Sequence, residues 1–169
     1  MSPEIVLSAM LSLTPYSGDR GDSTEARMDL YRPVAQNIAR VARTPSEAAI
    51  LVALGFHETG FARFVIEGRC SEGPPGQRCD GGKARGVFQL HASACPAAWK
   101  FPEGSPESLE LEAGCAIRLL RWNAVRGREH TITPAHAAFS GYAARDWGWG
   151  GADLRVKTTA GLLAKWGRS

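Results

Sequence analysis

Four expected helix starts share one device, a Ser or Thr followed by Pro, and it constrains the fold more than any other feature of the sequence. The pairs are Ser2-Pro3, Thr44-Pro45, Ser105-Pro106 and Thr133-Pro134. At a helix N-terminus the hydroxyl accepts a hydrogen bond from an unpaired backbone N–H, and proline fits the first helical position because it has no N–H to leave unpaired. Each pair therefore predicts the start of a helix. Glu47, three residues after Thr44, adds a capping box to the second pair.

The spacing of apolar residues extends these starts into a mainly helical chain. The expected helices cover 3–13, 25–42 with a break or restart at Pro33, 45–59 ending near Gly60, 106–127, a shorter segment after Pro134, and 153–166. A long loop region at 61–85 leads into 86–90, which suits a short strand or a turn. The pattern predicts an α+β fold that is mainly α-helical, with one small β element from 61–90.

Length and charge exclude several classes of protein. A chain of 169 residues has the size of one domain. The net charge of +3 arises without a block of Lys or Arg, so nucleic acid is not an expected partner. No apolar run reaches the roughly 18 residues of a membrane-spanning helix, so no integral membrane segment is expected. Phosphate-binding loop and nucleophile-elbow motifs are absent, and no cofactor is predicted.

The four cysteines bear on the compartment in which the protein works. Cys70, Cys79, Cys95 and Cys115 allow three pairings. We predict the disulfides Cys70–Cys79 and Cys95–Cys115, because each closes a short loop between neighbours. Disulfides indicate an oxidising, extracytoplasmic location, whereas four free thiols in a cytosolic protein remain the alternative. The apolar stretch near the N-terminus has no basic residue before it, so it lacks the first part of a signal peptide.

The helix expected at 45–59 contains the strongest candidate for acid–base chemistry. Ile50, Leu54 and Glu58 are four residues apart and so share one face. Burial on an apolar face and the dipole of the last helical turn both favour a protonated carboxyl, which is what a general acid requires. The alternative is a surface carboxylate at a fraying helix end. His57-Glu58 does not begin a zinc motif, because Phe61 stands where the second histidine is needed, and no metal site is predicted.

Aromatic residues gather late in the chain, at Phe139, Tyr142, Trp147 and Trp149. The two tryptophans lie in a Gly-rich segment and are expected on a loop. Their rings could stack on sugars or could fill the core beneath the loop, and the sequence leaves both readings open. Trp99, Trp122 and Trp166 fall in or beside helical patterns and are expected in the core.

Three segments in order resemble a known family. They are Glu58-Thr59-Gly60-Phe61, then Ala84-Arg85-Gly86-Val87-Phe88-Gln89-Leu90, then Ala137-Ala138-Phe139-Ser140-Gly141-Tyr142. They are similar to the motifs of soluble lytic transglycosylases and goose-type lysozymes, in the lysozyme-like superfamily. That family has a helix ending in Glu-Ser, a Gly-Leu-Met-Gln turn and a later Ala-Tyr-Asn-Ala-Gly segment. The resemblance covers about 45–166.

The chain departs from the family pattern at several positions. Thr59 replaces serine and keeps a hydroxyl, and Val87-Phe88 replaces Leu-Met. Phe139-Ser140 stands where Tyr-Asn is usual, so the tyrosine hydroxyl that contacts the acid is missing there, and Tyr142 is the expected substitute. Glu58 and Gln89 are 31 residues apart, a long separation that the Cys70–Cys79 loop would explain.

The resemblance implies one lysozyme-like domain over 1–169, with 1–43 as a helical extension and 44–169 as the catalytic core. It implies a muramidase that cleaves the β-1,4 bond between N-acetylmuramic acid and N-acetylglucosamine in peptidoglycan strands, with Glu58 as acid and then base. The residues expected to bind substrate are Thr59, Gln89, Phe139, Ser140, Tyr142, Trp147 and Trp149. A second carboxylate for hydrolysis could come from Glu67, Glu72 or Asp80; without one, the 6-hydroxyl of the substrate would close an anhydro ring.

Two other functions stay open. The altered Phe139-Ser140 segment is compatible with a non-catalytic wall-binding component of a phage tail or secretion machine. A glycosidase that acts on chitin or chitosan would use the same acid, because these polymers share N-acetylglucosamine units with peptidoglycan.

Overall fold

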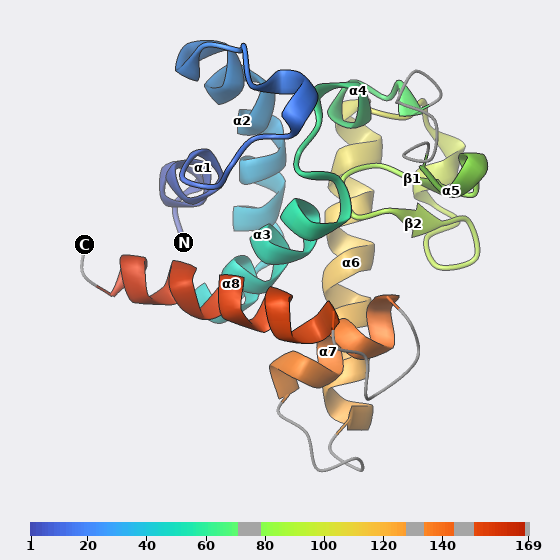
Figure 1. The fold of residues 1–169 in the computed structure, drawn as a ribbon. Coiled ribbons are helices and arrows are strands. Elements are labelled where there is room, and N and C mark those ends of the chain that lie inside the picture. The colour runs from blue at the N-terminus through green and yellow to red at the C-terminus, as the bar shows by residue number, and fades with distance from the viewer. Residues whose placement is uncertain (71–78, 128–133, 144–150, 168–169) are drawn as a thin grey trace.

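Helices surround one central helix, and a two-stranded sheet lies at the side of the molecule (Figure 1). The computed structural model describes residues 1–70, 79–127, 134–143 and 151–167. The helices are α1 (Pro3–Leu11), α2 (Thr24–Val41), α3 (Pro45–Thr59), α4 (Arg63–Ile66), α5 (Cys79–Gly82), α6 (Pro106–Arg126), α7 (Pro134–Ala143) and α8 (Gly151–Trp166), with 3₁₀ turns η1 (Ser17–Asp19) and η3 (Ala98–Lys100). The strands are β1 (Ala84–Arg85) and β2 (Leu90–His91).

The predicted N-caps start the helices. The side chains of Ser2, Thr44 and Ser105 each accept a hydrogen bond from the backbone N–H three residues later, at 3.2–3.4 Å. The helix predicted from the fourth pair is α7, which begins at Pro134; Thr133 lies outside the described residues. In the predicted capping box, the Glu47 carboxylate accepts from the N–H of Arg43 at 2.6 Å, one residue before the N-cap.

The expected break at Pro33 is wrong, because α2 runs through this residue without interruption. A proline inside a helix costs about 3 kcal/mol, since it removes one hydrogen bond and crowds the preceding turn. On the same helix Tyr31, Val34, Ala35 and Ile38 are at most 2% exposed. Burying four such side chains contributes more than the proline costs, so packing keeps the helix continuous.

The small β element is confirmed. β1 and β2 are antiparallel, with Ala84 opposite His91 and Arg85 opposite Leu90. Residues 86–89 form the turn that joins them, so most of the segment predicted as strand or turn is turn. Gly86 (φ 69°) and Gln89 (φ 48°) both have left-handed backbone conformations.

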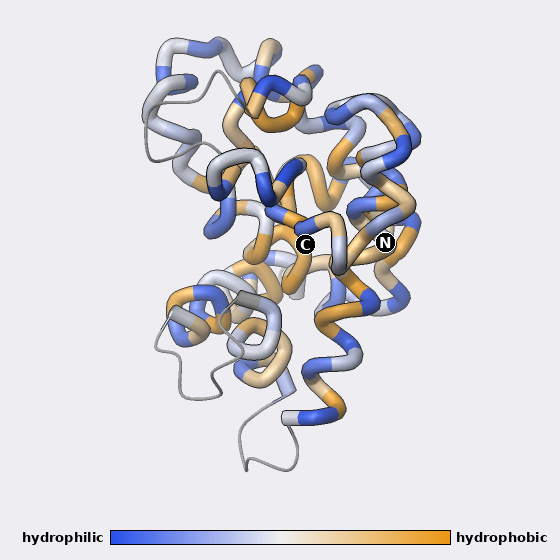
Figure 2. Tube along the Cα trace, turned by 90° about the vertical axis from the view of Figure 1, so that its right-hand side faces the viewer, coloured by the Kyte–Doolittle hydropathy of each residue, from blue (hydrophilic) through white to orange (hydrophobic). Residues whose placement is uncertain are grey.

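Helix α3 forms the middle of the core. Its residues Ala48, Ala49, Leu51, Val52, Ala53 and Leu54 are fully buried. It packs against α1, α2, α6 and α8, and α8 crosses it in Figure 1. Figure 2 shows hydrophobic and hydrophilic residues alternating along the outer helices, as expected when one face is buried. None of the described helices combines the length and apolar character needed to cross a bilayer.

Both predicted disulfides are present. The Cα atoms of Cys70 and Cys79 are 5.7 Å apart, and those of Cys95 and Cys115 are 5.8 Å apart. The first bridge joins the end of the α4 loop to α5. The second ties the segment before η3 to the middle of α6.

Replacing Cys95 and Cys115 together by alanine is expected to lower the free energy of unfolding by about 3 kcal/mol, because this bridge closes a loop of 20 residues. Denaturant unfolding of the variant and the parent measures the difference. The same replacement at Cys70 and Cys79, a loop of 9 residues, should cost about 0.7 kcal/mol less. Equal stability with and without the longer bridge would contradict this expectation.

Trp122 is not in the core, contrary to the prediction. Its side chain is 56% exposed on the outer face of α6, and the Arg126 guanidinium stacks over its ring at 4.5 Å. A helical pattern alone does not show which face of α6 packs against α7, and Trp122 lies on the exposed face. Trp99 and Trp166 are partly buried.

Candidate active-site cleft

Glu58 lies in the last turn of α3, where the chain turns sharply. The helix ends at Gly60, whose left-handed conformation (φ 61°) allows the chain to leave in a new direction. Glu58 opens into a cavity of about 330 Å³ that is also lined by residues of the η1 region, α4, α5 and the β turn: Tyr16, His57, Thr59, Gly60, Phe64, Val65, Cys79, Asp80 and Gln89. The predicted acid, Thr59 and Gln89 therefore line the same cavity.

Arg155 of α8 is the direct partner of Glu58. Its Nη2 donates to Oε1 of Glu58 at 2.8 Å, and the two side chains are only 10% and 18% exposed. The apolar stripe of α3 thus ends at a charged partner, which the spacing along α3 alone did not indicate. The sequence carries a signal for this contact in the spacing of the residues buried along α8, which are Ala152, Arg155, Thr159 and Leu162.

A second contact joins the ends of α3 and α8. His57 Nε2 lies 2.8 Å from Oγ1 of Thr158. Burial and then the nearby charge of Arg155 lower the pKa of His57 below its usual value. His57 is therefore a neutral side chain near neutral pH, and it holds α8 against the acid-bearing helix.

The turn 86–89 is the meeting point of the three motif segments. Oγ1 of Thr59 lies 3.0 Å from the Gly55 carbonyl and 3.3 Å from the Val87 carbonyl. Tyr142 donates its hydroxyl to the Phe88 carbonyl at 2.7 Å. The turn is thereby fixed to both α3 and α7.

Gln89 stabilises the turn from within. Its Nε2 donates to the Gly86 carbonyl at 3.0 Å and lies 3.5 Å from the sulfur of Cys79. The hydrogen bond between the turn and α3 is made by Thr59 and not by Gln89. Gln89 nevertheless lines the Glu58 cavity, as predicted for a substrate-binding residue.

Tyr142 reaches the site without bonding to the acid. Burial, followed by the negative charges of Glu58 and Glu112, raises its pKa well above the usual value. The phenol consequently stays protonated at neutral pH and remains a donor to the turn. The Tyr142 hydroxyl was expected to contact the acid. In the structure it donates a hydrogen bond to the Phe88 carbonyl instead.

Phe139 and Ser140, predicted to bind substrate, are completely buried. The Phe139 ring belongs to the main hydrophobic core, and Oγ of Ser140 lies 3.2 Å from Nδ1 of His136. Because α7 turns this face towards the core, neither side chain lies on the cleft wall. Trp147 and Trp149 lie outside the described residues.

Of the three candidate second carboxylates, Asp80 shares the cavity with Glu58. Its Oδ2 lies 3.5 Å from Nε2 of His91. Glu67 does not line the cavity and is bound by Arg69 and Arg63, which lower its pKa. Glu72 lies outside the described residues.

Glu112 on α6 is a buried carboxyl that the sequence analysis missed. It is 1% exposed, and its Oε1 accepts a hydrogen bond from Ser108 at 2.8 Å. A Cβ on Gly86 would overlap its Oε2, so this carboxyl packs directly against the backbone of the turn 86–89. The spacing of Glu112 with the buried Ser108 and Ala116 on α6 is the signal that could have found it.

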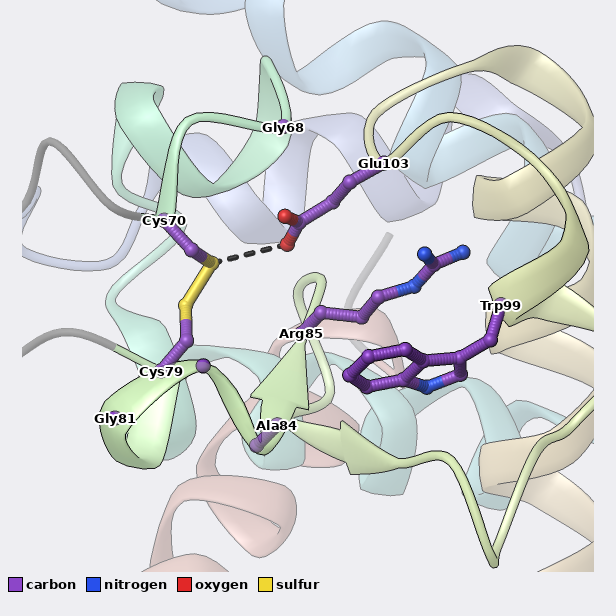
Figure 3. A pocket seen from close by; sticks show the side chains of 9 residues that line it. Gly68, Cys70, Cys79, Gly81, Ala84, Arg85, Trp99 and Glu103 are labelled. Atoms are coloured by element: carbon purple, nitrogen blue, oxygen red, sulfur yellow. Dashed lines mark hydrogen bonds between the residues drawn. A yellow bond between two sulfur atoms is a disulfide. The ribbon is translucent and has the colours of Figure 1, made fainter.

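Arg85 and Glu103 complete the support behind the turn (Figure 3). Nη2 of Arg85 bonds to the Ala98 carbonyl and, at 3.1 and 3.0 Å, to the Phe101 carbonyl and Ser108, while its guanidinium lies over the Trp99 ring. Oε1 of Glu103 accepts from the Gly86 N–H at 2.9 Å. The carboxyl groups of Glu103 and Glu112 therefore both contact the turn at Gly86.

These groups line a separate cavity of about 430 Å³, which lies against the Cys70–Cys79 disulfide (Figure 3). Within the described part of the chain, Cys70, Cys79 and Glu103 are the group whose ligand atoms come close enough for a metal ion, within 4.8 Å. The two sulfurs are bonded to each other, and a disulfide has no thiolate to offer a metal.

Glu112 predicts a specific dependence of stability on pH. Burial raises its pKa from 4.5 to about 7, against the opposing effects of Ser108 and Arg85. The folded protein thus holds this proton more tightly than the unfolded chain, so the stabilisation is complete below about pH 4.5 and is lost as the pH rises through about 7. The loss amounts to about 3 kcal/mol.

A Glu112→Gln variant is expected to remove this loss, because the amide stays neutral and can still accept from Ser108. Denaturant unfolding at pH 5 and pH 8 measures the change in each protein. Glu110→Gln, which alters a half-exposed carboxylate of the same helix, is the control and should follow the parent. An unchanged pH dependence in Glu112→Gln would show that this carboxyl does not titrate as described.

Comparison of the chain with models of protein families, with curated proteins and with solved structures found no match.

Proposed function

We propose that the protein is a peptidoglycan-degrading muramidase with a lysozyme-like fold, in which Glu58 protonates the β-1,4 bond between N-acetylmuramic acid and N-acetylglucosamine. The observation that supports this most is the convergence of three distant segments. Thr59 and Tyr142 bond to adjacent carbonyls of the turn that carries Gln89, and Glu58 opens into the cavity beside it. The segments with the family resemblance thus form one unit around a carboxyl.

The first chemical step is proton transfer from Glu58 to the glycosidic oxygen. Arg155 occupies Oε1 of the carboxyl, which leaves Oε2 as the oxygen that carries the proton. The bond from the anomeric carbon to the leaving oxygen then breaks through a state with oxocarbenium character, and the leaving sugar keeps the proton. Glu58 becomes a carboxylate, and the Arg155 guanidinium stabilises its charge.

The second step depends on which nucleophile reaches the anomeric carbon. If the 6-hydroxyl of the muramic acid attacks, its oxygen forms the new bond and its proton returns to Glu58, giving a 1,6-anhydro product. If water attacks, a second carboxylate is needed to position it, and Asp80 is the candidate that lines the same cavity. The two outcomes differ by one water in product mass.

Digestion of purified peptidoglycan, with the soluble products separated and weighed by mass spectrometry, tests the proposal. Anhydro-muramic ends indicate a lytic transglycosylase working with Glu58 alone. Reducing ends with an added water indicate hydrolysis, and Asp80→Asn should then abolish the activity. Chitin oligomers digested in parallel identify the alternative glycosidase. The absence of products from every polymer would remove the catalytic proposal.

A second candidate, a non-catalytic wall-binding protein, is favoured by one observation. Arg155 binds the Glu58 carboxyl directly, so Oε1 of the candidate acid is already engaged by a side chain of the protein itself. This candidate predicts that the protein sediments with peptidoglycan and releases no muropeptides. Release of muropeptides that Glu58→Gln abolishes would exclude it.

A further inference from the structure

The Cys70–Cys79 disulfide borders two cavities. Both cysteines line the cavity of about 430 Å³, and Cys79 also lines the cavity into which Glu58 opens. Figure 3 shows the bridge at the edge of the larger cavity, with the Glu103 carboxyl directed at the Cys70 sulfur. A cavity of this size has room for a small organic ligand. A small thiol compound inside it would lie against the bridge.

The Cys95–Cys115 disulfide has different surroundings. Its cysteines are 0% and 2% exposed and belong to the main hydrophobic core, whereas Cys70 and Cys79 belong to a separate, smaller cluster. A thiolate is the species that cleaves a disulfide, and a charged thiolate is costly to bring into a close-packed apolar core. The cavity therefore makes Cys70–Cys79 the more reactive of the two bridges.

Two side chains connect the Cys70–Cys79 bridge to the turn between β1 and β2. Oε1 of Glu103 lies 3.0 Å from Sγ of Cys70 and accepts a hydrogen bond from the Gly86 N–H at 2.9 Å. Nε2 of Gln89 lies 3.5 Å from Sγ of Cys79 and donates to the Gly86 carbonyl at 3.0 Å. Both polar backbone groups of Gly86 are thus bound by side chains that also contact the bridge. A change at the sulfurs consequently reaches the turn through either side chain.

The backbone directly after the bridge has an unfavourable conformation. The φ angles of Cys79, Asp80, Gly81 and Gly82 are 36°, 51°, 65° and 83°, all in the left-handed region. This region is unfavourable for the first two of these residues, because each carries a Cβ. In this conformation Asp80 lines the Glu58 cavity. Cleavage of the bridge removes the covalent restraint on this segment, so the segment can relax and withdraw Asp80 from the cavity.

We propose that Cys70–Cys79 is a site of thiol–disulfide exchange, at which a low-molecular-weight thiol cleaves the bridge from the larger cavity and thereby opens one wall of the Glu58 cavity. In the first step the incoming thiolate bonds to Sγ of Cys70 and displaces Sγ of Cys79 as a thiolate. Cys79 is the better leaving sulfur because Nε2 of Gln89 faces it, whereas the carboxyl of Glu103 faces Cys70.

The second step completes the reduction. A second small thiol attacks the sulfur of the first, and the mixed disulfide at Cys70 breaks. The products are two protein thiols and one disulfide of the small thiol. The two electrons that reduce the bridge come from the two small thiols, and their two protons end on the sulfurs of Cys70 and Cys79.

The consequence for catalysis rests on the proposed function. With the bridge intact, Gln89 and Asp80 are held in the wall of the Glu58 cavity; with the bridge cleaved, both lose a restraint. We expect the reduced protein to release muropeptides roughly 10–100-fold more slowly, because a displacement of about 1 Å in a site can cost this much. The protein would then work in oxidising surroundings and would be held back where small thiols are abundant.

The first experiment compares the reactivity of the two bridges. The folded full chain is treated with reduced glutathione for increasing times, free thiols are blocked with N-ethylmaleimide, and mass spectrometry of the peptides locates the blocked cysteines. We expect Cys70 and Cys79 to become blocked about tenfold faster than Cys95 and Cys115. Equal rates would overturn the inference. In denaturant the difference should disappear; its persistence would also overturn the inference, because the folded cavity would not be its cause.

The second experiment follows the connection to the turn. The backbone amide resonance of Gly86 and the side-chain amide resonances of Gln89 should shift when glutathione reduces the Cys70–Cys79 bridge. A variant with both Cys70→Ser and Cys79→Ser should show the shifted positions without glutathione. Resonances that stay in place after reduction would overturn the inference. If the double variant does not fold, the unsubstituted protein decides the question alone.

The matched control for this variant is Cys95→Ser together with Cys115→Ser. It keeps the Cys70–Cys79 bridge and should therefore respond to glutathione as the parent does, at both Gly86 and Gln89. A response that requires the Cys95–Cys115 bridge would assign the effect to the wrong disulfide and would overturn the inference.

The outcomes also separate this inference from the proposed function. Selective reduction of Cys70–Cys79 with shifts at Gly86 and Gln89, in a protein that releases no muropeptides in either redox state, would support the exchange site and remove the catalytic proposal. Release of muropeptides at the same rate with the bridge intact and cleaved would keep the catalytic proposal and overturn the exchange site as a control of it.

Discussion

Glu58→Gln is expected to lower the release of muropeptides by about 10²–10⁴-fold, the usual contribution of general acid–base catalysis. Glutamine has nearly the shape of glutamate but has no acidic proton for the glycosidic oxygen. The measurement is the initial rate of release of soluble products from purified peptidoglycan. Full activity in the variant would show that another group is the acid.

The same substitution is also expected to lower stability. If Glu58 lay on an apolar helix face without a charged partner, replacing it by glutamine would leave the free energy of unfolding unchanged or raise it. With Arg155 at 2.8 Å and only 10% exposed, the substitution replaces a charge-assisted hydrogen bond to a buried guanidinium by a neutral one. The loss of a hydrogen bond to a charged group costs about 1.5–3 kcal/mol.

Glu47→Gln provides the matched control for both effects. Glu47 lies at the opposite end of the same helix and pairs with Arg121 at 2.7 Å, with both side chains largely shielded from solvent. This variant should also lose stability, and its initial rate should equal that of the parent under conditions where both are folded. A comparable loss of activity in Glu47→Gln would mean that destabilisation, not loss of the acid, explains the result at Glu58.

Gly86→Ala is expected to lower the free energy of unfolding by about 3 kcal/mol or more. Two costs combine at this position. The backbone φ of 69° is unfavourable for any residue with a Cβ, and the added carbon would overlap Oε2 of Glu112. Glu112 is held by Ser108 in the packed interior, so it cannot move away freely.

Denaturant unfolding of Gly86→Ala checks this expectation, and Gly114→Ala is its control. Gly114 lies inside α6 with no atom within 4 Å of an added Cβ. Alanine is the better helix former there and should raise stability by about 0.5–1 kcal/mol. A Gly86→Ala variant as stable as the parent would mean that the turn and Glu112 are not packed as described.

The parts of the structure that the sequence predicted are those with local causes. The caps at Ser2, Thr44 and Ser105 involve atoms within three residues of each other, and so the helix starts could be read directly. The disulfides followed from the short spacing of the cysteines. Glu58 could be named as a candidate acid because its neighbours on the helix face are four residues apart, and its role stays a prediction.

What the sequence analysis missed depends on contacts between distant elements. Arg155 meets Glu58 across 97 residues, and local spacing cannot show which face of α8 meets α3. Phe139 was assigned to the cleft by its place in a motif, whereas the packing of α7 on α6 buries it. The partners of Glu112 follow from the position of the turn 86–89 over α6.

The Glu58–Arg155 pair has a consequence for biosynthesis. A chain growing on the ribosome completes α3 long before α8 exists, so during this interval the carboxyl of Glu58 has no guanidinium beside it and the Thr158 contact of His57 is missing. Contacts between residues so far apart in the chain form late, because a long loop must close before they can be made. The arrangement around Glu58 can thus be completed only after α8 has left the ribosome.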